Sequence, residues 1–205
     1  MIYCGVNSLC ALDLNDLNLG ISHQEAIDLL KEEGFTVVAV DLLAMARKQI
    51  GVPYKRCALL SEAPHLFDCS SLIKWLYGFR GIWLPRSLLL WSGLGKDVSE
   101  NNLEPGDIIC TSGRRNYPVE SIAGGIGHVG MATSQQTIIH ASNHVGVEEV
   151  TLDYFLSKRS FRVARRLASN DAVITLKIPE EKEAETSDDI AWILRHKLES
   201  KRWAK

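Results

Sequence analysis

The sequence predicts an α+β domain in which helices come first and a meander of strands follows. Helical periodicity occurs in the first 80 residues, at 22–33, 39–50 and 68–78. Short β-rich runs bounded by turn residues fill the rest of the domain: 108–111, 128–133, 137–142, 147–151, 161–166 and 172–178. This order of elements indicates helices packed on one central antiparallel sheet.

Local signals mark the ends of the helices. Ser22 and Glu25 form a capping-box pattern, and Gly34 suits the position just past a helix C-terminus. The second helical run is closed by Gly51, and the third begins after Asp68 and ends within 78–81.

The strand region opens at a turn. Residues 103–107 read L-E-P-G-D, which indicates a turn leading into a strand at 108–111. Residues 112–127 carry four glycines and one proline, so we expect a long loop there.

Composition changes along the chain suggest three segments. We expect an N-terminal extension with one helix at 1–38, a catalytic domain at 39–178 and a charged helical tail at 179–205. In the tail an acidic run precedes a basic run, which complements a helix dipole, and Ser187 is the expected N-cap. The apolar stripe of this helix is expected to pack on its own domain, with contact to a partner as the alternative.

Composition also excludes several classes of protein. Apolar residues make up 46% and charged residues 23% of the chain, as in ordinary globular proteins. The formal net charge of -2 gives no basic footprint for nucleic acid. Five scattered cysteines without a CxxC pair predict no disulfide framework and fit a reducing compartment.

Targeting signals are not evident. No Lys or Arg precedes Lys31, so the charged start of a secretory signal is missing, and no apolar run is long enough to span a membrane. The default expectation is a cytoplasmic protein, with leaderless release or a processed form as alternatives.

Cys69 is the first candidate for chemistry. It follows the capping residue Asp68 in the run F-D-C-S-S-L-I, so it lies in the first turn of a helix. Unpaired N–H groups and the positive helix end there favour a thiolate and can stabilise an oxyanion. The remaining cysteines are expected to be buried or incidental thiols.

Two strand histidines are candidates for the base and its orienting group. His128 stands in G-H-V-G-M and His140 in I-I-H-A-S. If the turn between the strands has an odd number of residues, such as 134–136, Gly130 opposes His140, and His128 is its diagonal neighbour on the same face. A two-residue turn would point the two rings in opposite directions.

With these pieces in order, the chain resembles the NlpC family of papain-like peptidoglycan peptidases. The matching runs lie between residues 40 and 166: I-G-V-P-Y at 50–54, F-D-C-S at 67–70, L-P-R-S at 84–87, L-E-P-G-D-I at 103–108, G-H-V-G-M at 127–131, I-H-A-S at 139–142 and the strand at 161–166. The resemblance implies a papain-like NlpC fold with the nucleophile at a helix N-terminus.

The resemblance also implies roles for individual residues. Cys69 matches the nucleophile, His128 the base and His140 the third, orienting residue. Tyr54 matches a tyrosine of the active-site wall. Asp68 and Ser70 match positions that shape the helix start and the substrate groove; Arg86 reads as a structural or a groove residue.

The family hydrolyses amide bonds of cell-wall peptides, typically the bond between γ-D-glutamate and a diamino acid, and needs no metal or organic cofactor. The implied partners are therefore peptidoglycan fragments or muropeptides. Three local departures stand out: Ser71 replaces a common glycine, Cys110 and Thr111 replace an aromatic pair, and the long loop at 112–127 carries Arg114 and Arg115. These two arginines can pair with a substrate carboxylate, or they are simply solvated.

Other functions remain open at this level. A papain-like acyltransferase, or an amidase on a non-wall substrate, would keep the same thiol and change the acceptor. A metal-binding module would use Cys69, His128 and His140 as ligands. An inactive binding protein would have no use for a poised thiol.

Overall fold

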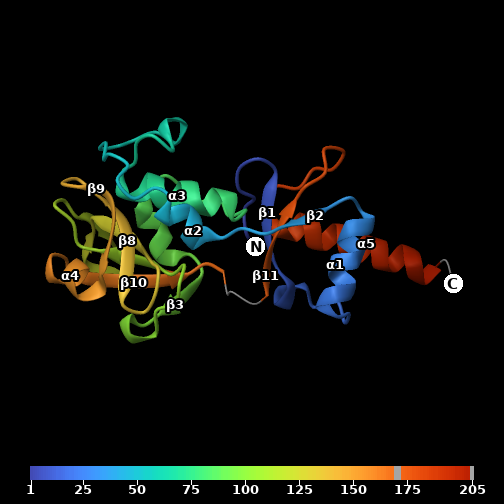
Figure 1. The fold of residues 1–205 in the computed structure, drawn as a ribbon. Helices are drawn as coiled ribbons and strands as arrows, with labels where there is room; N and C mark the ends of the chain where they lie inside the picture. Colours follow the sequence, from blue (N-terminus) through green and yellow to red (C-terminus); the bar gives the residue numbers. More distant parts are fainter. Residues whose placement is uncertain (169–171, 204–205) are drawn as a thin grey trace. The chain divides into compact units, whose positions relative to one another are not determined.

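The described residues form three antiparallel sheets, of six, three and two strands (Figure 1). The computed structural model describes residues 1–168 and 172–203. Contacts divide these residues into two units. Unit 1 comprises Met1–Val40, Tyr77–Leu84 and the described part of 169–205; unit 2 comprises Asp41–Leu76 and Pro85–Ala168. The predicted α+β class with antiparallel strands is confirmed.

Unit 2 is built on a six-stranded antiparallel sheet of order β3-β10-β4-β7-β8-β9. Its strands are β3 (Lys96–Val98), β4 (Ile108–Thr111), β7 (His128–Ala132), β8 (Thr137–Ser142), β9 (Gly146–Thr151) and β10 (Phe161–Arg166). The runs predicted around β4, β7, β8, β9 and β10 therefore form one sheet.

Three α-helices accompany this sheet: α2 (Leu42–Arg47), α3 (Cys69–Phe79) and α4 (Leu152–Ser157). Short 3-10 turns occupy Leu60–Glu62, Leu88–Gly93 and Glu100–Asn102. Phe155 of α4 is fully buried in a core with apolar residues of β4, β7, β8 and β10. Through Phe155, α4 thus packs on the sheet face that carries the rings of His128 and His140.

The prediction of a long loop at 112–127 is wrong. It contains a two-stranded hairpin, β5 (Tyr117–Val119) and β6 (Ile122–Ile126), with a register shift between its two pairs. Gly125 has φ +66°, and a Cβ there would lie 2.2 Å from the carbonyl oxygen of Tyr117. Glycine is therefore required by the close backbone approach, and its presence hid the alternation that announces a strand.

Unit 1 contains a three-stranded sheet of order β1-β11-β2, formed by β1 (Leu9–Asp13), β11 (Val173–Lys177) and β2 (Thr36–Val38). β11 falls in the segment 39–178 assigned to the catalytic domain from sequence, yet it pairs with strands from the first 40 residues. A strand pattern predicts the strand and leaves its partner undetermined.

Two helices pack in unit 1. α1 (His23–Glu32) begins as predicted, because Ser22 Oγ accepts from the backbone N–H of Glu25 at 3.1 Å. α5 (Ser187–Trp203) buries Ile190 and Leu194 completely in the unit 1 core. The tail thus packs within its own unit, as expected.

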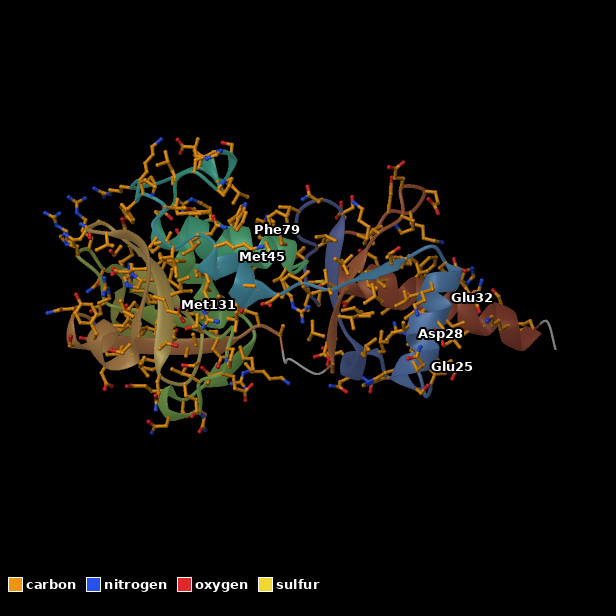
Figure 2. All side chains as sticks on the ribbon, in the orientation of Figure 1. Glu25, Asp28, Glu32, Met45, Phe79 and Met131 are labelled. Atoms are coloured by element: carbon orange, nitrogen blue, oxygen red, sulfur yellow. A yellow bond between two sulfur atoms is a disulfide. The ribbon has the colours of Figure 1, made fainter. Side chains whose placement is uncertain are left out.

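Charges on α1 complement the basic end of α5. Figure 2 shows Glu25, Asp28 and Glu32 along one side of α1, and Glu32 forms an ion pair with Lys201 at 2.8 Å. Ser187 was expected to be the N-cap, but it is the first residue of the helix itself. Its Oγ accepts a hydrogen bond from the backbone N–H of Ile2.

A disulfide joins Cys4 to Cys10, which contradicts the prediction of unpaired thiols. Asn7 and Ser8 both adopt positive φ, so the chain reverses between the two cysteines. This reversal brings together residues whose spacing matches no familiar disulfide pattern. Because disulfides persist mainly in oxidising compartments, the cysteines no longer argue for a reducing one. Within the described ranges, we find no helix with the length and apolarity to cross a bilayer.

Candidate active site

A reciprocal cap holds the start of α3. Asp68 Oδ1 accepts from the backbone N–H of Ser71 at 2.7 Å, and Ser71 Oγ accepts from the backbone N–H of Asp68 at 2.8 Å. Ser71 thus plays the part that Glu has in the usual capping box. The Asp-x-x-Ser spacing at 68–71 is a signal for such a cap, although from the sequence Ser71 stood out only as a departure from glycine.

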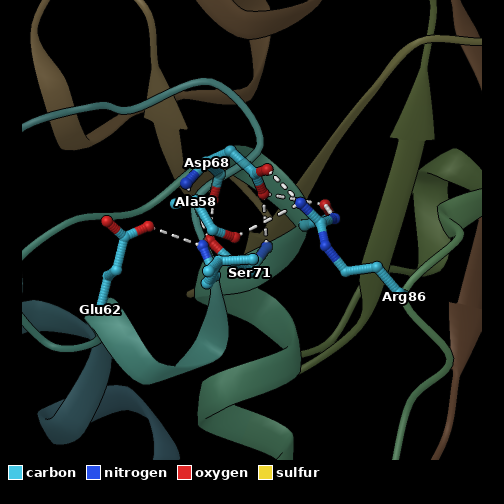
Figure 3. A network of polar contacts seen from close by, with 7 residues as sticks. Ala58, Glu62, Asp68, Ser71 and Arg86 are labelled. Atoms are coloured by element: carbon cyan, nitrogen blue, oxygen red, sulfur yellow. Dashed lines mark hydrogen bonds and ion pairs between the residues drawn. The ribbon is translucent and has the colours of Figure 1, made fainter.

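Arg86, from the segment of this chain that follows α3, binds the cap (Figure 3). Its Nη2 lies 2.6 Å from Asp68 Oδ2, and its Nη1 donates to Ser70 Oγ at 2.5 Å. Ser70 Oγ in turn donates to Asp68 Oδ1 at 2.9 Å. The guanidinium is half-exposed and lines the cavity described below. Arg86 is therefore both a structural partner of Asp68 and a residue of the groove.

Cys69 is the first residue of α3 and is only 8% exposed. Burial, followed by the negative charge of Asp68, raises the pKa of its thiol to about 12. Backbone N–H groups of Val129 and Ser70 and the charge of Arg86 act in the opposite direction and are outweighed. Burial and Asp68 therefore act against the thiolate that the sequence led us to expect.

The hairpin carrying the two histidines has the odd turn on which the prediction depended. Met131 pairs with Ile139, and the backbone N–H of Thr133 donates to Thr137 O at 2.9 Å, which leaves 134–136 as the turn. His128 Nε2 lies 3.1 Å from His140 Nδ1. The two rings therefore share one face of the sheet and contact each other directly.

Both histidines lie in an apolar setting. The ring of Phe155 is 5.8 Å from that of His128 and 5.0 Å from that of His140, centre to centre. Burial, with a smaller contribution from Arg159, lowers the pKa of His128 well below its usual value. The same two causes lower the pKa of His140 to about 3. Both rings are neutral at pH 7 and able to accept a proton.

A cavity of about 610 Å³ opens over the start of α3. Cys69 and His128 both line it, together with the other residues singled out from sequence: Tyr54, Asp68, Ser70, Arg86, Arg114 and Arg115. His140 lies behind His128 and does not line the cavity.

Three polar residues of the cavity escaped the sequence analysis: Arg56, Asn143 and Arg159. No local pattern marks them, because the fold alone brings them to the cavity. Glu148 was also missed. It stands opposite His140 on β9, with its Oε1 3.6 Å from His140 Nε2.

Tyr54 lies on the wall of the cavity that Cys69 also lines. It forms an isolated parallel bridge with Phe67, just before α3. Burial, followed by the charges of Cys69 and Asp68, raises the pKa of its hydroxyl to about 12. The hydroxyl therefore stays protonated and can donate a hydrogen bond into the cavity.

The described residues contain no group of three or more His, Cys, Asp and Glu side chains placed to hold a metal ion. Cys69, His128 and His140 therefore do not form a ligand set in this structure.

Residues 51–165, more than half of the chain, match the NlpC/P60 family. The chain belongs to this family. The resemblance inferred from the short motifs is thus confirmed. The match covers α3, which begins with Cys69, and the strands β7 and β8 that carry His128 and His140.

Relatives in the NlpC/P60 family include three bacterial enzymes. A probable endopeptidase of Corynebacterium glutamicum is 34% identical over 110 residues, which are 53% of this chain and 46% of that protein. The gamma-DL-glutamyl hydrolase of Bacillus subtilis is 33% identical over 116 residues, 56% of this chain and 25% of that protein. The murein DD-endopeptidase and LD-carboxypeptidase MepS of Escherichia coli is 31% identical over 104 residues, half of each chain. The chain thus matches half or less of the length of these relatives.

Solved structures support the NlpC/P60 fold. An NlpC/P60 family protein from Bacillus cereus superposes with a TM-score of 0.55 and 25% identity, covering 65% of this chain and 42% of that one. NlpC2 from Trichomonas vaginalis gives a TM-score of 0.51 and 23% identity, with coverages of 62% and 45%.

Proposed function

We propose that the NlpC/P60 domain of this chain is a cysteine peptidase that hydrolyses an amide bond in the stem peptides of peptidoglycan. Cys69 is the nucleophile, His128 the base and His140 the group that orients His128. The observation that carries the proposal is that Cys69 and His128 line one cavity while His140 Nδ1 lies 3.1 Å from His128 Nε2. A nucleophile, a base and an orienting group are the parts that acyl transfer requires.

The ionisation states define the first step. Because the Cys69 thiol and the His128 ring are both neutral at rest, the proton passes from sulfur to His128 as the sulfur attacks the substrate carbonyl. A C–S bond forms, and the carbonyl electrons move to oxygen. Backbone N–H groups at the start of α3 receive this oxyanion.

The remaining steps return the enzyme to its starting state. Protonated His128 gives its proton to the leaving amine as the C–N bond breaks, which leaves a thioester on Cys69. Water, deprotonated by His128, then attacks the thioester. The C–S bond breaks, the acid is released, and His128 returns the proton to the sulfur of Cys69.

Charge in the cavity favours an anionic peptide. Arg56, Arg114, Arg115 and Arg159 line it, whereas Asp68, the one acidic residue among the described residues of its wall, is already paired with Arg86. Stem peptides carry free carboxylates next to the amide bonds, so these guanidinium groups match them. We therefore favour the bond between γ-D-glutamate and a diamino acid, which has a carboxylate on both sides.

The names of the relatives support this substrate class and leave the bond open. The Bacillus subtilis relative is named for γ-glutamyl bonds, whereas the Escherichia coli relative is named for DD and LD bonds.

Digestion of defined muropeptides, read by mass spectrometry, tests the proposal. We expect cleavage by the wild type and none by Cys69→Ala. Cys110→Ala is the matched control, because Cys110 is also a buried free thiol but does not line the cavity. Equal products from wild type and Cys69→Ala would refute the cysteine mechanism. A parallel digest with a competing amine separates hydrolysis from transfer, since a transferase would yield the amine adduct.

The site of action is also a proposal. A cytoplasmic site of action stays a prediction, and fractionation of cells producing the natural full-length protein tests it.

A further inference from the structure

Resting on the proposed function, we propose that Glu148 is a fourth, positioning residue, which acts through His140 to set the tautomer of the base His128. The row would then run from Glu148 through His140 and His128 to Cys69. Glu148 itself touches neither substrate nor sulfur and does not line the cavity.

The register of the sheet brings Glu148 to this place. β8 and β9 pair so that His140 and Glu148 are directly opposite, and opposite residues project from the same face. Glu148 Oε1 lies 3.6 Å from His140 Nε2, and the Glu148 side chain is 22% exposed while that of His140 is 1% exposed. The carboxylate thus caps the buried end of the histidine pair.

An unsatisfied atom points to the same pairing. Within the described chain, His140 Nε2 is buried and has no hydrogen-bond partner. A buried polar nitrogen without a partner costs about 1–3 kcal/mol. Among the described residues, Glu148 places a carboxylate oxygen 3.6 Å from this atom, and in the proposed arrangement this separation shortens to hydrogen-bond length. Catalytic hydrogen bonds are often long in free enzymes and tighten when substrate binds.

A hydrogen bond from His140 to Glu148 decides which ring nitrogen of each histidine carries the proton. With a hydrogen bond from His140 Nε2–H to Glu148, His140 Nδ1 carries the lone pair. His128 Nε2 must then donate across the 3.1 Å contact, which leaves His128 Nδ1 as the free base. In the opposite arrangement, His140 Nδ1–H donates to His128 Nε2, and the proton on His128 Nδ1 blocks it from accepting from a thiol.

The groups around His140 other than Glu148 are the backbone of Ala141, which hydrogen-bonds the ring and raises its pKa, and the side chains of Phe155 and Arg159. Phe155 packs against its ring and has no polar atom in its side chain. Arg159 is a cation and cannot accept a proton from His140; its charge interacts with that of Glu148 and lowers the pKa of His140.

Kinetics of Glu148 variants test the proposal with the same muropeptides. We expect Glu148→Gln to lower kcat about tenfold, because a neutral hydrogen bond replaces a charge-assisted one. Glu148→Leu is expected to lower kcat about 100-fold. KM stays unchanged for both variants. Wild-type kcat in Glu148→Leu would overturn the proposal.

Glu149 provides the matched control. It is the next residue of β9, its side chain projects from the opposite face, and it binds Arg47 and Thr133. Glu149→Gln is expected to lower the melting temperature and keep kcat within twofold. A kcat loss in this variant equal to that of Glu148→Gln would show a general defect of β9 and overturn the specific role.

Nitrogen NMR of histidine-labelled protein gives a readout that does not depend on activity. At pH 7 we expect the Nε2 atoms of both His128 and His140 to carry the proton in wild type, and a mixture of tautomers in Glu148→Leu. His140 protonated on Nδ1 in wild type would overturn the proposal. Because this measurement needs no substrate, it stands even if the muropeptides are not cleaved.

Discussion

Asp68 and Arg86 are expected to tune the thiol of Cys69 in opposite directions. The Asp68 charge raises the pKa of Cys69 and the Arg86 charge lowers it. Asp68→Asn removes the negative charge but keeps the helix cap, because Asn is as good an N-cap as Asp. The pKa of Cys69 should therefore fall in Asp68→Asn. Arg86→Gln leaves the carboxylate uncompensated, so the pKa should rise.

The size of the effect follows from proximity. A charge within about 4–6 Å shifts a pKa by roughly one to three units. Since Asp68 is already paired with Arg86 at 2.6 Å, we expect the lower end, about one unit. One unit corresponds to about 1.4 kcal/mol and a tenfold change in thiolate at any pH well below the pKa.

Alkylation by iodoacetamide, followed by peptide mass spectrometry, measures this change. In wild type at pH 7 the exposed Cys57 should react before the buried Cys69. Cys69 should react about ten times faster in Asp68→Asn and more slowly in Arg86→Gln.

The control for this experiment is Asp41→Asn, which alters the equivalent cap of α2, where Asp41 Oδ1 accepts from Ala44 N–H at 2.9 Å. Its Cys69 rate should equal that of wild type. Slower alkylation in Asp68→Asn, in a variant whose thermal unfolding shows it to be folded, would refute the electrostatic reasoning.

Three further outcomes are expected. His140→Ala removes the partner of the base and should lower kcat for muropeptides about 100-fold. Asp107→Asn weakens the two 2.8 Å contacts with Arg166 and should cost about 2–3 kcal/mol in urea unfolding. Two lysine partners lower the pKa of Glu33 to about 2, from 4.5. Its ion pairs therefore stabilise the fold fully above about pH 4.5 and are lost as pH falls toward 2. Glu33→Gln should cost about 1 kcal/mol at pH 7, allowing for solvent screening, and less below pH 4 in pH-dependent unfolding.

Local chemistry explains what could be predicted from the sequence. The caps at Ser22 and Asp68 depend on residues at most three positions away, so the helix starts were correctly placed. The shared face of His128 and His140 depends on strand alternation and on one turn length, and both are local as well.

Features that depend on distant partners could not be predicted. The pairing of Cys4 with Cys10 requires two left-handed residues between them, and nothing in their composition announces that reversal. β11 joins a strand more than 150 residues earlier in the chain. Arg159 and Glu148 reach the site only after β8, β9 and α4 have assembled.

Two carboxylates flank the proposed series of groups Glu148, His140, His128 and Cys69. Asp68 lies beside the sulfur and disfavours its negative charge, whereas Glu148 lies beyond His140, where it favours positive charge on the histidine pair. The first effect keeps the resting thiol protonated. The second matters once the proton has reached His128, because the imidazolium can share its charge through His140 with Glu148. In the proposed mechanism Glu148 therefore stabilises a charge that forms only after proton transfer, and differential stabilisation of this kind raises kcat.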